Sequence, residues 1–264
     1  MEPPVGLLKF PRTPHLEGSA LQAGDEDVPR ARLDAADGVE AVVTEKLDGV
    51  NVGLRFDATG RPWLFSRGHF LGAEAWFDRL KQQVAAQAGE LFERLGTRFV
   101  LYGEWLGARH TVFYDALPGW LFVFDLFDVE ADGFLGTAAR RQRLDGLDLR
   151  EPPHVWRGPV SCMPELPRLL SKSRFVSLDV VTRFEALIEA RGLSLARERA
   201  WTQLSGQVEG LVFRLERDGQ FLSRCKYVRP GFRQTISLSE THWARRPWVP
   251  NLLAPVSGSI RRVV

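Results

Sequence analysis

The hydrophobic residues of this chain fall into short runs that predict β-strands. Residues 41–56 (AVVTEKLDGVNVGLRF) contain two β-rich runs around a Leu-Asp-Gly turn, and residues 62–68 (PWLFSRG) follow a second turn. This pattern predicts a short antiparallel meander. More strands are expected in two apolar, aromatic stretches and in two runs joined by an Arg-Asp-Gly turn, at residues 98–105, 120–129, 207–216 and 220–228.

Apolar residues at helical spacing predict two amphipathic helices. The first covers residues 74–95 and stops at Gly96, and the second covers residues 179–192 and stops at Gly192. Their apolar positions are Phe77, Leu80, Val84, Leu91 and Leu95 in the first helix, and Val180, Val181, Phe184, Leu187 and Ile188 in the second. A short basic helix is expected within residues 137–150, followed by a Pro-rich connection at 151–178.

The patterns divide the chain into three parts. Residues 1–40 are rich in Pro, Gly and acidic residues and show no sustained period, so we expect an ordered lead-in of loops packed on the core. Residues 41–230 form the core, with a helical insertion at about 137–205. Residues 231–264 form a basic tail, in which arginines lie among prolines and tryptophans.

Composition excludes several classes of protein. The chain has 264 residues, 44% of them apolar, which suffices for one large or two small globular domains. Its two cysteines, Cys162 and Cys225, make no disulfide framework and suggest a reducing compartment. We find neither an apolar run long enough to cross a membrane nor a signal peptide, so we expect a cytoplasmic protein that does not contact membranes.

Lysine is rare among the basic residues. Lysine and arginine together number 35, and five are lysines (Lys9, Lys46, Lys81, Lys172 and Lys226), which leaves 30 arginines. A lysine in such a chain can mark chemistry that arginine cannot perform, above all the loss of a proton to become a nucleophile; random drift is the alternative. The net charge of +2 permits nucleic-acid binding but does not indicate it.

The segment Lys46-Leu47-Asp48-Gly49, followed by Asn51, is the sharpest candidate site. A nucleophilic lysine must be neutral to attack, and a neighbouring cation lowers its pKa. A surface hairpin with an Asp-Gly turn is the alternative for this segment on its own. Glu104 and Asp125 lie inside apolar runs, where a lone ionised carboxylate is costly unless it is paired or hydrogen-bonded.

Other short motifs follow the Lys46 segment in a fixed order. They are Ser66-Arg67-Gly68, Tyr102-Gly103-Glu104, Phe124-Asp125, Glu209-Gly210-Leu211-Val212 and Arg224-Cys225-Lys226-Tyr227. From about residue 45 to residue 227, this series resembles the covalent nucleotidyltransferase superfamily of RNA ligases, DNA ligases and mRNA capping enzymes. The stretches KFPRTPHLEGS and GEWLGARHTVFYDALP look most like RNA ligases of the phage RNA ligase 2 type and their small bacterial relatives.

The resemblance implies a fold and a reaction. The fold would be α+β, with an antiparallel-sheet adenylation core of the ATP-grasp-like ligase type and peripheral helices. Only 37 residues follow Tyr227, too few for the C-terminal oligonucleotide-binding barrel of DNA ligases and capping enzymes. The reaction would be ATP-dependent joining of an RNA 5′-phosphate to an RNA 3′-hydroxyl through lysyl-AMP and RNA-adenylate intermediates, with Mg²⁺ or Mn²⁺, in RNA repair. An end-healing kinase or phosphatase is a candidate partner.

The resemblance also implies roles for residues near the first motifs. Lys46 would become covalently adenylylated, and Glu45, Asp48 and Asn51 would shape the nucleotide site beside it. Arg67 would contact the nucleotide and the 5′-phosphate of the nucleic acid, and we count it with the catalytic residues.

The later motifs supply the rest of the implied site. Glu104 would accept hydrogen bonds from the ribose hydroxyls, and Phe124 would stack on the adenine. Asp125 would support the pocket and is a second candidate metal ligand beside Glu209.

The last motif departs from the pattern of many relatives, which have two lysines there. Arg224 and Lys226 alternate on one face of a strand, so both cations could reach one phosphate. Lys226 would touch the α-phosphate together with Arg224. A solvated strand edge is the alternative for this pair.

Three other functions stay open. A DNA ligase would use the same lysine, a GTP-dependent capping-type enzyme would attach GMP to it, and an RNA-binding module would retain the fold without turnover. The five histidines show no metal-ligand spacing, and the sequence contains no phosphate-binding GxxxxGK[ST] loop. The sequence does not decide among a nick, a single-stranded end and a broken tRNA loop, and it leaves the oligomeric state open.

Overall fold

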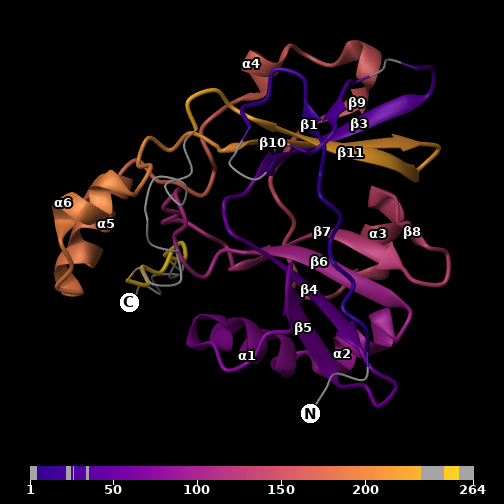
Figure 1. Ribbon diagram of the computed structural model, residues 1–264, viewed down its shortest axis with the longest axis horizontal. Helices are drawn as coiled ribbons and strands as arrows, with labels where there is room; N and C mark the ends of the chain where they lie inside the picture. Colours follow the sequence, from indigo (N-terminus) through magenta and orange to yellow (C-terminus); the bar gives the residue numbers. More distant parts are fainter. Residues whose placement is uncertain (1–4, 22–24, 26, 34–35, 233–246, 256–264) are drawn as a thin grey trace, which may run out of the picture.

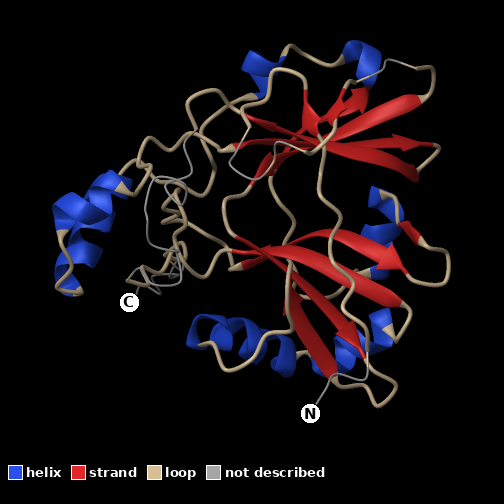
Figure 2. Ribbon diagram, in the orientation of Figure 1, coloured by secondary structure: helices blue, strands red, loops and turns tan. Residues whose placement is uncertain are grey.

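The computed structural model describes residues 5–21, 25, 27–33, 36–232 and 247–255. In these ranges the chain forms two β-sheets, which lie one above the other in Figure 1. The helices lie outside the space that separates the central strands of the upper sheet from those of the lower sheet (Figure 2). Most of the predicted tail at 231–264 falls outside the described residues, and so do Arg245, Arg246, Arg261 and Arg262.

The upper sheet has six strands in the order β2-β1-β11-β10-β3-β9. Its strands are β1 (His15–Leu16), β2 (Arg30–Ala31), β3 (Val39–Lys46), β9 (His154–Pro159), β10 (Gly210–Arg217) and β11 (Gln220–Val228). Neighbouring strands are antiparallel, except that β1 runs parallel to both β2 and β11. The lead-in therefore extends the sheet beyond the predicted β10–β11 hairpin, which is confirmed.

The lower sheet has five strands in the order β5-β4-β6-β7-β8, all antiparallel. Its strands are β4 (Val50–Phe56), β5 (Pro62–Ser66), β6 (Phe99–Trp105), β7 (Leu121–Asp128) and β8 (Gly133–Phe134). The aromatic runs at 98–105 and 120–129 are thus central strands, as predicted. The expected α+β fold built on antiparallel sheets is confirmed.

The predicted meander at 41–68 is wrong in one respect, because β3 and β4 belong to different sheets. The segment Leu47-Asp48-Gly49 is not a hairpin turn but carries the chain from the upper sheet to the lower one. Asp48 fixes this crossing: its carboxylate accepts hydrogen bonds from the backbone N–H groups of Thr111 and Val112, both at 2.7 Å. Lys46 therefore lies where the two sheets meet.

Two glycines permit the close packing around this crossing. A Cβ at Gly49 would lie 2.5 Å from the carbonyl oxygen of Trp105, and a Cβ at Gly210 would lie 1.9 Å from that of Tyr227. Both distances are shorter than a carbon–oxygen contact allows. Since Gly210 is the register partner of Lys46, the backbone next to the lysine has no room for a side chain.

The helix predicted at 74–95 is divided. A short 3₁₀ turn, η1 (Ala75–Phe77), precedes α1 (Asp78–Ala86) and α2 (Ala88–Leu95), and Gln87 between the two helices has φ −124° and ψ 21°, outside the helical region. No apolar residue needs burial between Val84 and Leu91, so packing does not require a continuous helix there. The predicted apolar face still packs as one cluster under the lower sheet.

The helical insertion predicted at about 137–205 is wrong at β9, which is the edge strand beside β3. As an edge strand with mostly half-buried side chains, β9 lacks the apolar alternation that predicts a strand, and it contains Gly158 and Pro159. The helical elements of this interval are α3 (Thr137–Arg143), η2 (Val160–Cys162), α4 (Leu166–Leu169), α5 (Val180–Ala190) and α6 (Leu195–Ala200). The predicted basic helix and the second amphipathic helix correspond to α3 and α5.

Helical segments cover the outer faces of both sheets, whereas the inner faces of the two sheets are turned toward each other. The lower sheet buries Val52, Leu54 and Leu101 against α1 and α2. The upper sheet buries Val43 and Phe213 against the segment around α4. Among the described residues, no helix combines the length and the apolar character that crossing a membrane would require.

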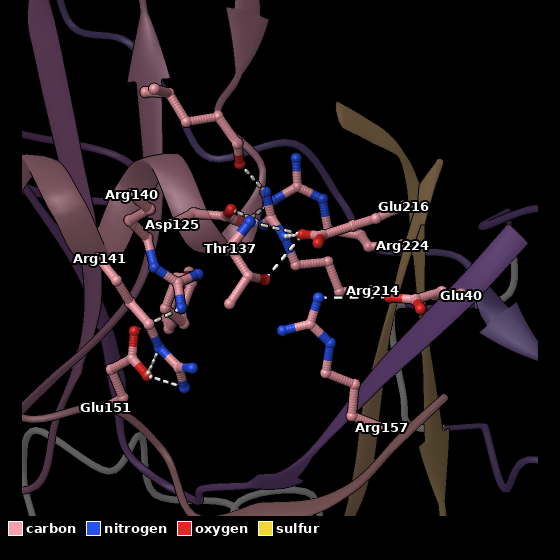
Figure 3. A network of polar contacts seen from close by, with 12 residues as sticks. Glu40, Asp125, Thr137, Arg140, Arg141, Glu151, Arg157, Arg214, Glu216 and Arg224 are labelled. Atoms are coloured by element: carbon pink, nitrogen blue, oxygen red, sulfur yellow. Dashed lines mark hydrogen bonds and ion pairs between the residues drawn. The ribbon is translucent and has the colours of Figure 1, made fainter. Parts of the chain in front are cut away.

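Asp125 of β7 connects the two sheets at their inner faces. Its carboxylate forms ion pairs with Arg214 of β10 and Arg224 of β11 (Figure 3). All three side chains are at least nine-tenths buried. Glu216 accepts a further hydrogen bond from Arg214 at 2.8 Å and two from Thr137 at the start of α3, both at 2.7 Å. The acid that was unusual in its apolar run is thus paired with two cations.

We expect Asp125→Ala to lower the free energy of unfolding by about 3–5 kcal/mol, because it leaves buried arginine charge uncompensated. Urea denaturation measures the change. Asp148→Ala is the matched control, since Asp148 pairs with Arg150 at 2.8 Å but is 80% exposed. We expect the control to cost less than about 1 kcal/mol. Equal losses in the two variants would contradict a structural role for the Asp125 bridge.

Candidate active site

A cavity of about 420 Å³ lies between the inner faces of the two sheets. This cavity is lined by most of the site residues that the sequence predicted. They come from both sheets, and Lys46 and Lys226 are 180 positions apart in the chain. They are Glu45, Lys46, Asp48, Asn51, Arg67, Glu104, Phe124, Asp125, Arg224 and Lys226. Glu209 is not among the lining residues, but it contacts Lys46 directly. The fold thus brings the scattered motifs together around one hollow.

Strand register explains the upper wall of the cavity. Alternate residues of a strand point to one face, and Thr44 and Lys46 of β3 both line the cavity. Val212 of β10 is the register partner of both Thr44 and Lys226. The two lysines therefore stand on one face of the upper sheet, with β10 between them.

The lower wall is supplied by the other sheet. Asn51 of β4 and Glu104 of β6 are register partners, so their side chains share a face. Phe124 of β7 and Arg67, which follows β5, complete this wall. Glu104 also accepts a hydrogen bond from the backbone N–H of Gly49 at 3.1 Å, which ties the wall to the crossing segment.

Carboxylates surround Lys46. Its Nζ donates to Glu209 Oε2 at 2.7 Å, and Glu209 is fully buried. Burial acts to lower the pKa of Lys46, but the charges of Glu209, Glu104 and Asp48 outweigh it, so the net direction is upward. Before any ligand binds, Lys46 is therefore a protonated cation held in an ion pair.

Two of these carboxyl groups are held in an unfavourable environment. Burial raises the pKa of Glu104 to about 7, although Lys46 and Arg67 act in the opposite direction. Burial also raises the pKa of Asp48, although its bonds from Val112 and Thr111 oppose this. A neutral or easily protonated Glu104 can donate as well as accept hydrogen bonds, which suits recognition of hydroxyl groups.

The two cations of the last motif have different surroundings. Arg224 pairs with Asp125, and its guanidinium lies 3.8 Å from the ring centroid of Phe134 and 4.4 Å from that of Phe10. Burial lowers the pKa of Arg224 to about 10. Lys226 instead donates to Asp25 at 2.6 Å. Both line the cavity, as expected from their shared face, but each is bound to its own carboxylate.

Glu45 points away from Lys46. As neighbours in a strand, the two side chains face opposite sides of the sheet. Burial raises the pKa of Glu45 to about 7, with Ser173 and Arg174 acting in the opposite direction. The carboxyl group of Glu45 thus lies on the face of the sheet opposite Lys46, near the segment that follows α4.

Several cavity residues were not singled out in the sequence as site residues. Asp25, Thr13 and Phe10 come from the lead-in, and Arg140 and Arg214 come from α3 and β10. Arg214 lies two residues after Val212 on β10. Because alternate residues of a strand point to one face, the sequence could have predicted that Arg214 shares the cavity face with Val212. Nothing local in the lead-in indicates that Asp25 meets Lys226, since their contact spans 201 positions.

A sequence model of the RNA ligase family matches residues 39–228. The chain belongs to the RNA ligase family. The matched segment begins at the first residue of β3 and ends at the last residue of β11, so it contains both walls of the cavity apart from the lead-in. No curated protein matches the sequence of this family member.

Solved RNA ligases have a similar fold. Naegleria gruberi RNA ligase with PPi has a TM-score of 0.51 at 18% identity, covering 72% of this chain and 50% of its own. A mutant of that ligase with ATP and Mn has a TM-score of 0.47 at 17% identity, with coverages of 72% and 50%. An archaeal ATP-dependent RNA ligase has a TM-score of 0.46 at 18% identity, covering 84% of this chain and 48% of its own. This RNA ligase family member spans about half the length of these structures.

The carboxylates around Lys46 suit a metal ion that is bound together with the substrate phosphates. Among the described residues, no group of three or more His, Cys, Asp or Glu side chains could hold an ion by itself. Mg²⁺ commonly uses one or two carboxylates together with substrate phosphates and water. The buried carboxylate of Glu209 could serve as such a ligand in this RNA ligase family member, whereas Asp125 is engaged by two arginines.

Replacement of Glu45 by Gln tests whether burial raises the pKa of the Glu45 carboxyl group. Because the folded-state pKa is raised, ionisation of Glu45 costs stability as the pH rises from the unfolded pKa to about 7. We expect Glu45→Gln to be more stable than the wild type at pH 8, by on the order of 2 kcal/mol, and to lose this advantage toward pH 5. Urea denaturation across this range measures it. A stability difference independent of pH would contradict the raised pKa.

Proposed function

We propose that this protein is an ATP-dependent RNA ligase that joins RNA 5′-phosphate and 3′-hydroxyl ends, with Lys46 as its nucleophile. The observation that carries the proposal is the placement of Lys46 where the two sheets meet, with Lys226 on its own wall and Arg67 and Glu104 on the opposite wall. A phosphate chain in this cavity would be flanked by cations, and a ribose would meet Glu104. Membership of the RNA ligase family supports the same chemistry.

In the first proposed step, Lys46 Nζ attacks the α-phosphorus of ATP. A nitrogen–phosphorus bond forms and the bond to pyrophosphate breaks, leaving lysyl-AMP. The ammonium group must first lose a proton to solvent, which the carboxylates around Lys46 oppose and a bound cation would favour. Bound Mg²⁺ or Mn²⁺ would neutralise charge on the triphosphate.

In the next two proposed steps, an RNA 5′-phosphate oxygen displaces Lys46 from the AMP phosphorus. An RNA 3′-hydroxyl then attacks the activated 5′-phosphate and expels AMP. Each step develops negative charge at a phosphorus centre, and Lys226 and Arg67 are the cavity cations proposed to stabilise it. Phe124 offers an aromatic face for the adenine.

The wider proposal concerns the fold and the setting. We assign residues 41–230 to an adenylation core of the ATP-grasp-like ligase type, with residues 1–40 as a lead-in and 231–264 as a tail. Cys162 and Cys225 are both free thiols, which agrees with a reducing, cytoplasmic setting. An end-healing enzyme is a candidate partner, because joining needs a 5′-phosphate and a 3′-hydroxyl.

Covalent labelling tests the nucleophile. Incubated with α-³²P-labelled ATP and Mg²⁺ or Mn²⁺, the wild type should retain label on a denaturing gel, whereas Lys46→Ala and Lys46→Arg should lose it. Arginine retains the positive charge but cannot act as a nucleophile at neutral pH. Lys81→Ala, which removes a lysine of α1 that does not line the cavity, is the control and should label normally.

The outcomes separate the alternative functions. Label from GTP instead of ATP would favour a capping-type enzyme. No label from either nucleotide, in folded protein free of prior adenylylation, would contradict the enzyme proposal and favour an RNA-binding module.

A second experiment compares RNA with DNA. On a nicked duplex with a 5′-phosphate, we expect replacement of the 3′-hydroxyl strand by DNA to slow sealing by at least about tenfold, because the 2′-hydroxyl distinguishes RNA from DNA. Quantified product on a denaturing gel gives the ratio. Equal rates with the two strands would favour a DNA-joining enzyme, and a single-stranded RNA substrate in parallel shows whether a nick is needed.

A further inference from the structure

The lead-in crosses from one sheet to the other and reaches the cavity from outside the segment matched by the RNA ligase family. Leu7, Leu8 and Phe10 pack on the lower sheet, next to Tyr102 and Phe124. The chain then adds β1 to the upper sheet, as the indigo strand in Figure 1, where His15 is the register partner of Lys226.

A continuous set of hydrogen bonds leads from the lead-in to Lys226. His15 is fully buried, and its Nε2 lies 2.8 Å from Asp25 Oδ2. Its Nδ1 lies 2.7 Å from the hydroxyl of Ser19, which accepts from the backbone N–H of Val228 at 2.9 Å. Because a carboxylate accepts, Nε2 carries the proton and Nδ1 accepts from Ser19. This arrangement fixes the direction in which Asp25 points.

Asp25 is bound on both carboxylate oxygens. Oδ2 accepts from Lys226 at 2.6 Å and from His15, and Oδ1 accepts from Arg12 at 3.3 Å. Although burial acts to raise it, the bonds from His15 and Lys226 hold the pKa of Asp25 below its ordinary value. Burial lowers the pKa of His15, so the imidazole is neutral near pH 7. Asp25 is therefore the anion of this set.

The charge on Lys226 depends on this anion. Burial lowers the pKa of Lys226, and the positive charges of Lys46 and Arg67 act in the same direction. Asp25 is the nearby group that opposes them. The other charged groups in reach are Arg12, which contacts Asp25, and Arg224 on the same strand, which pairs with Asp125. Without Asp25, Lys226 would be a buried cation next to other cations.

We propose that Asp25, oriented by His15, is a positioning residue that keeps Lys226 protonated and directed into the cavity. This inference rests on the proposed function, since it concerns the lysine assigned to the α-phosphate. In this role Asp25 acts through Lys226, to which it is hydrogen-bonded, rather than on the substrate. The lead-in thus supplies part of the phosphate side of the site.

The test is the pH dependence of lysyl-AMP formation in full-length Asp25→Asn, expressed as its rate relative to the wild type. A lowered pKa means that Lys226 loses its charge as the pH rises through that value. We expect the ratio to be highest near pH 6 and to fall by about tenfold for each pH unit above the lowered pKa. His15→Ala should show a smaller change in the same direction, because Asp25 remains but is less well oriented.

Two further variants separate this role from a general structural one. Asp27→Asn removes an exposed carboxylate that binds Arg12 at 2.7 Å, and it should match the wild type at every pH. Combining Asp25→Asn with Lys226→Arg should abolish the pH dependence of the ratio, because a guanidinium stays charged throughout this range. A merely misfolded variant would not regain a flat profile through a change at Lys226.

The outcomes distinguish this inference from the proposed function. Absence of label in the wild type would refute the proposed function itself. If the wild type is labelled but the ratio for Asp25→Asn is the same at all pH values, the positioning role is overturned. Faster labelling of Asp25→Asn at all pH values would also overturn it, since Asp25 would then compete with the nucleotide phosphate for Lys226.

Discussion

The bridge from Asp125 to two arginines is the constraint on which the rest of the structure depends. Two sheets that face each other across a hollow gain little from direct apolar packing at that place, and something else must hold their separation. The buried carboxylate of β7 does this by pairing with β10 and β11. The same strand places Phe124 in the cavity wall, so the aromatic face and the bridge are set by adjacent residues.

The cost of this arrangement is a set of buried charges. Removal of a carboxylate from water is unfavourable unless cations and hydrogen bonds compensate it. Around Asp125 two arginines share the carboxylate, and although burial lowers the pKa of Arg224 to about 10, that side chain remains a cation at neutral pH. Around Lys46 several carboxyl groups face one cation, and Glu104 and Asp48 both have raised pKa values there. That difference separates the part of the inner surface that holds the sheets from the part that is suited to chemistry.

The sequence predicted the strands well, because buried central strands have the apolar and aromatic composition that distinguishes them. It predicted the candidate site through short motifs whose members the fold places around one cavity. It failed where the information was not local. The pairing of β3 and β4 with different sheets depends on bonds from Asp48 to a loop more than 60 positions away. The edge strand β9 has no apolar alternation, and the contact of Asp25 with Lys226 joins distant parts of the chain.

The parallel pairing of β1 with β11 has a consequence for how this family is divided into units. The match to the RNA ligase family model begins at residue 39, yet the upper sheet continues through β11 into β1 and β2. The segment matched by the family model is therefore smaller than the upper sheet to which it contributes. A change in the lead-in would alter the surroundings of Lys226 while every residue of the matched segment stayed the same, so this edge of the sheet can tune the cavity from outside that segment.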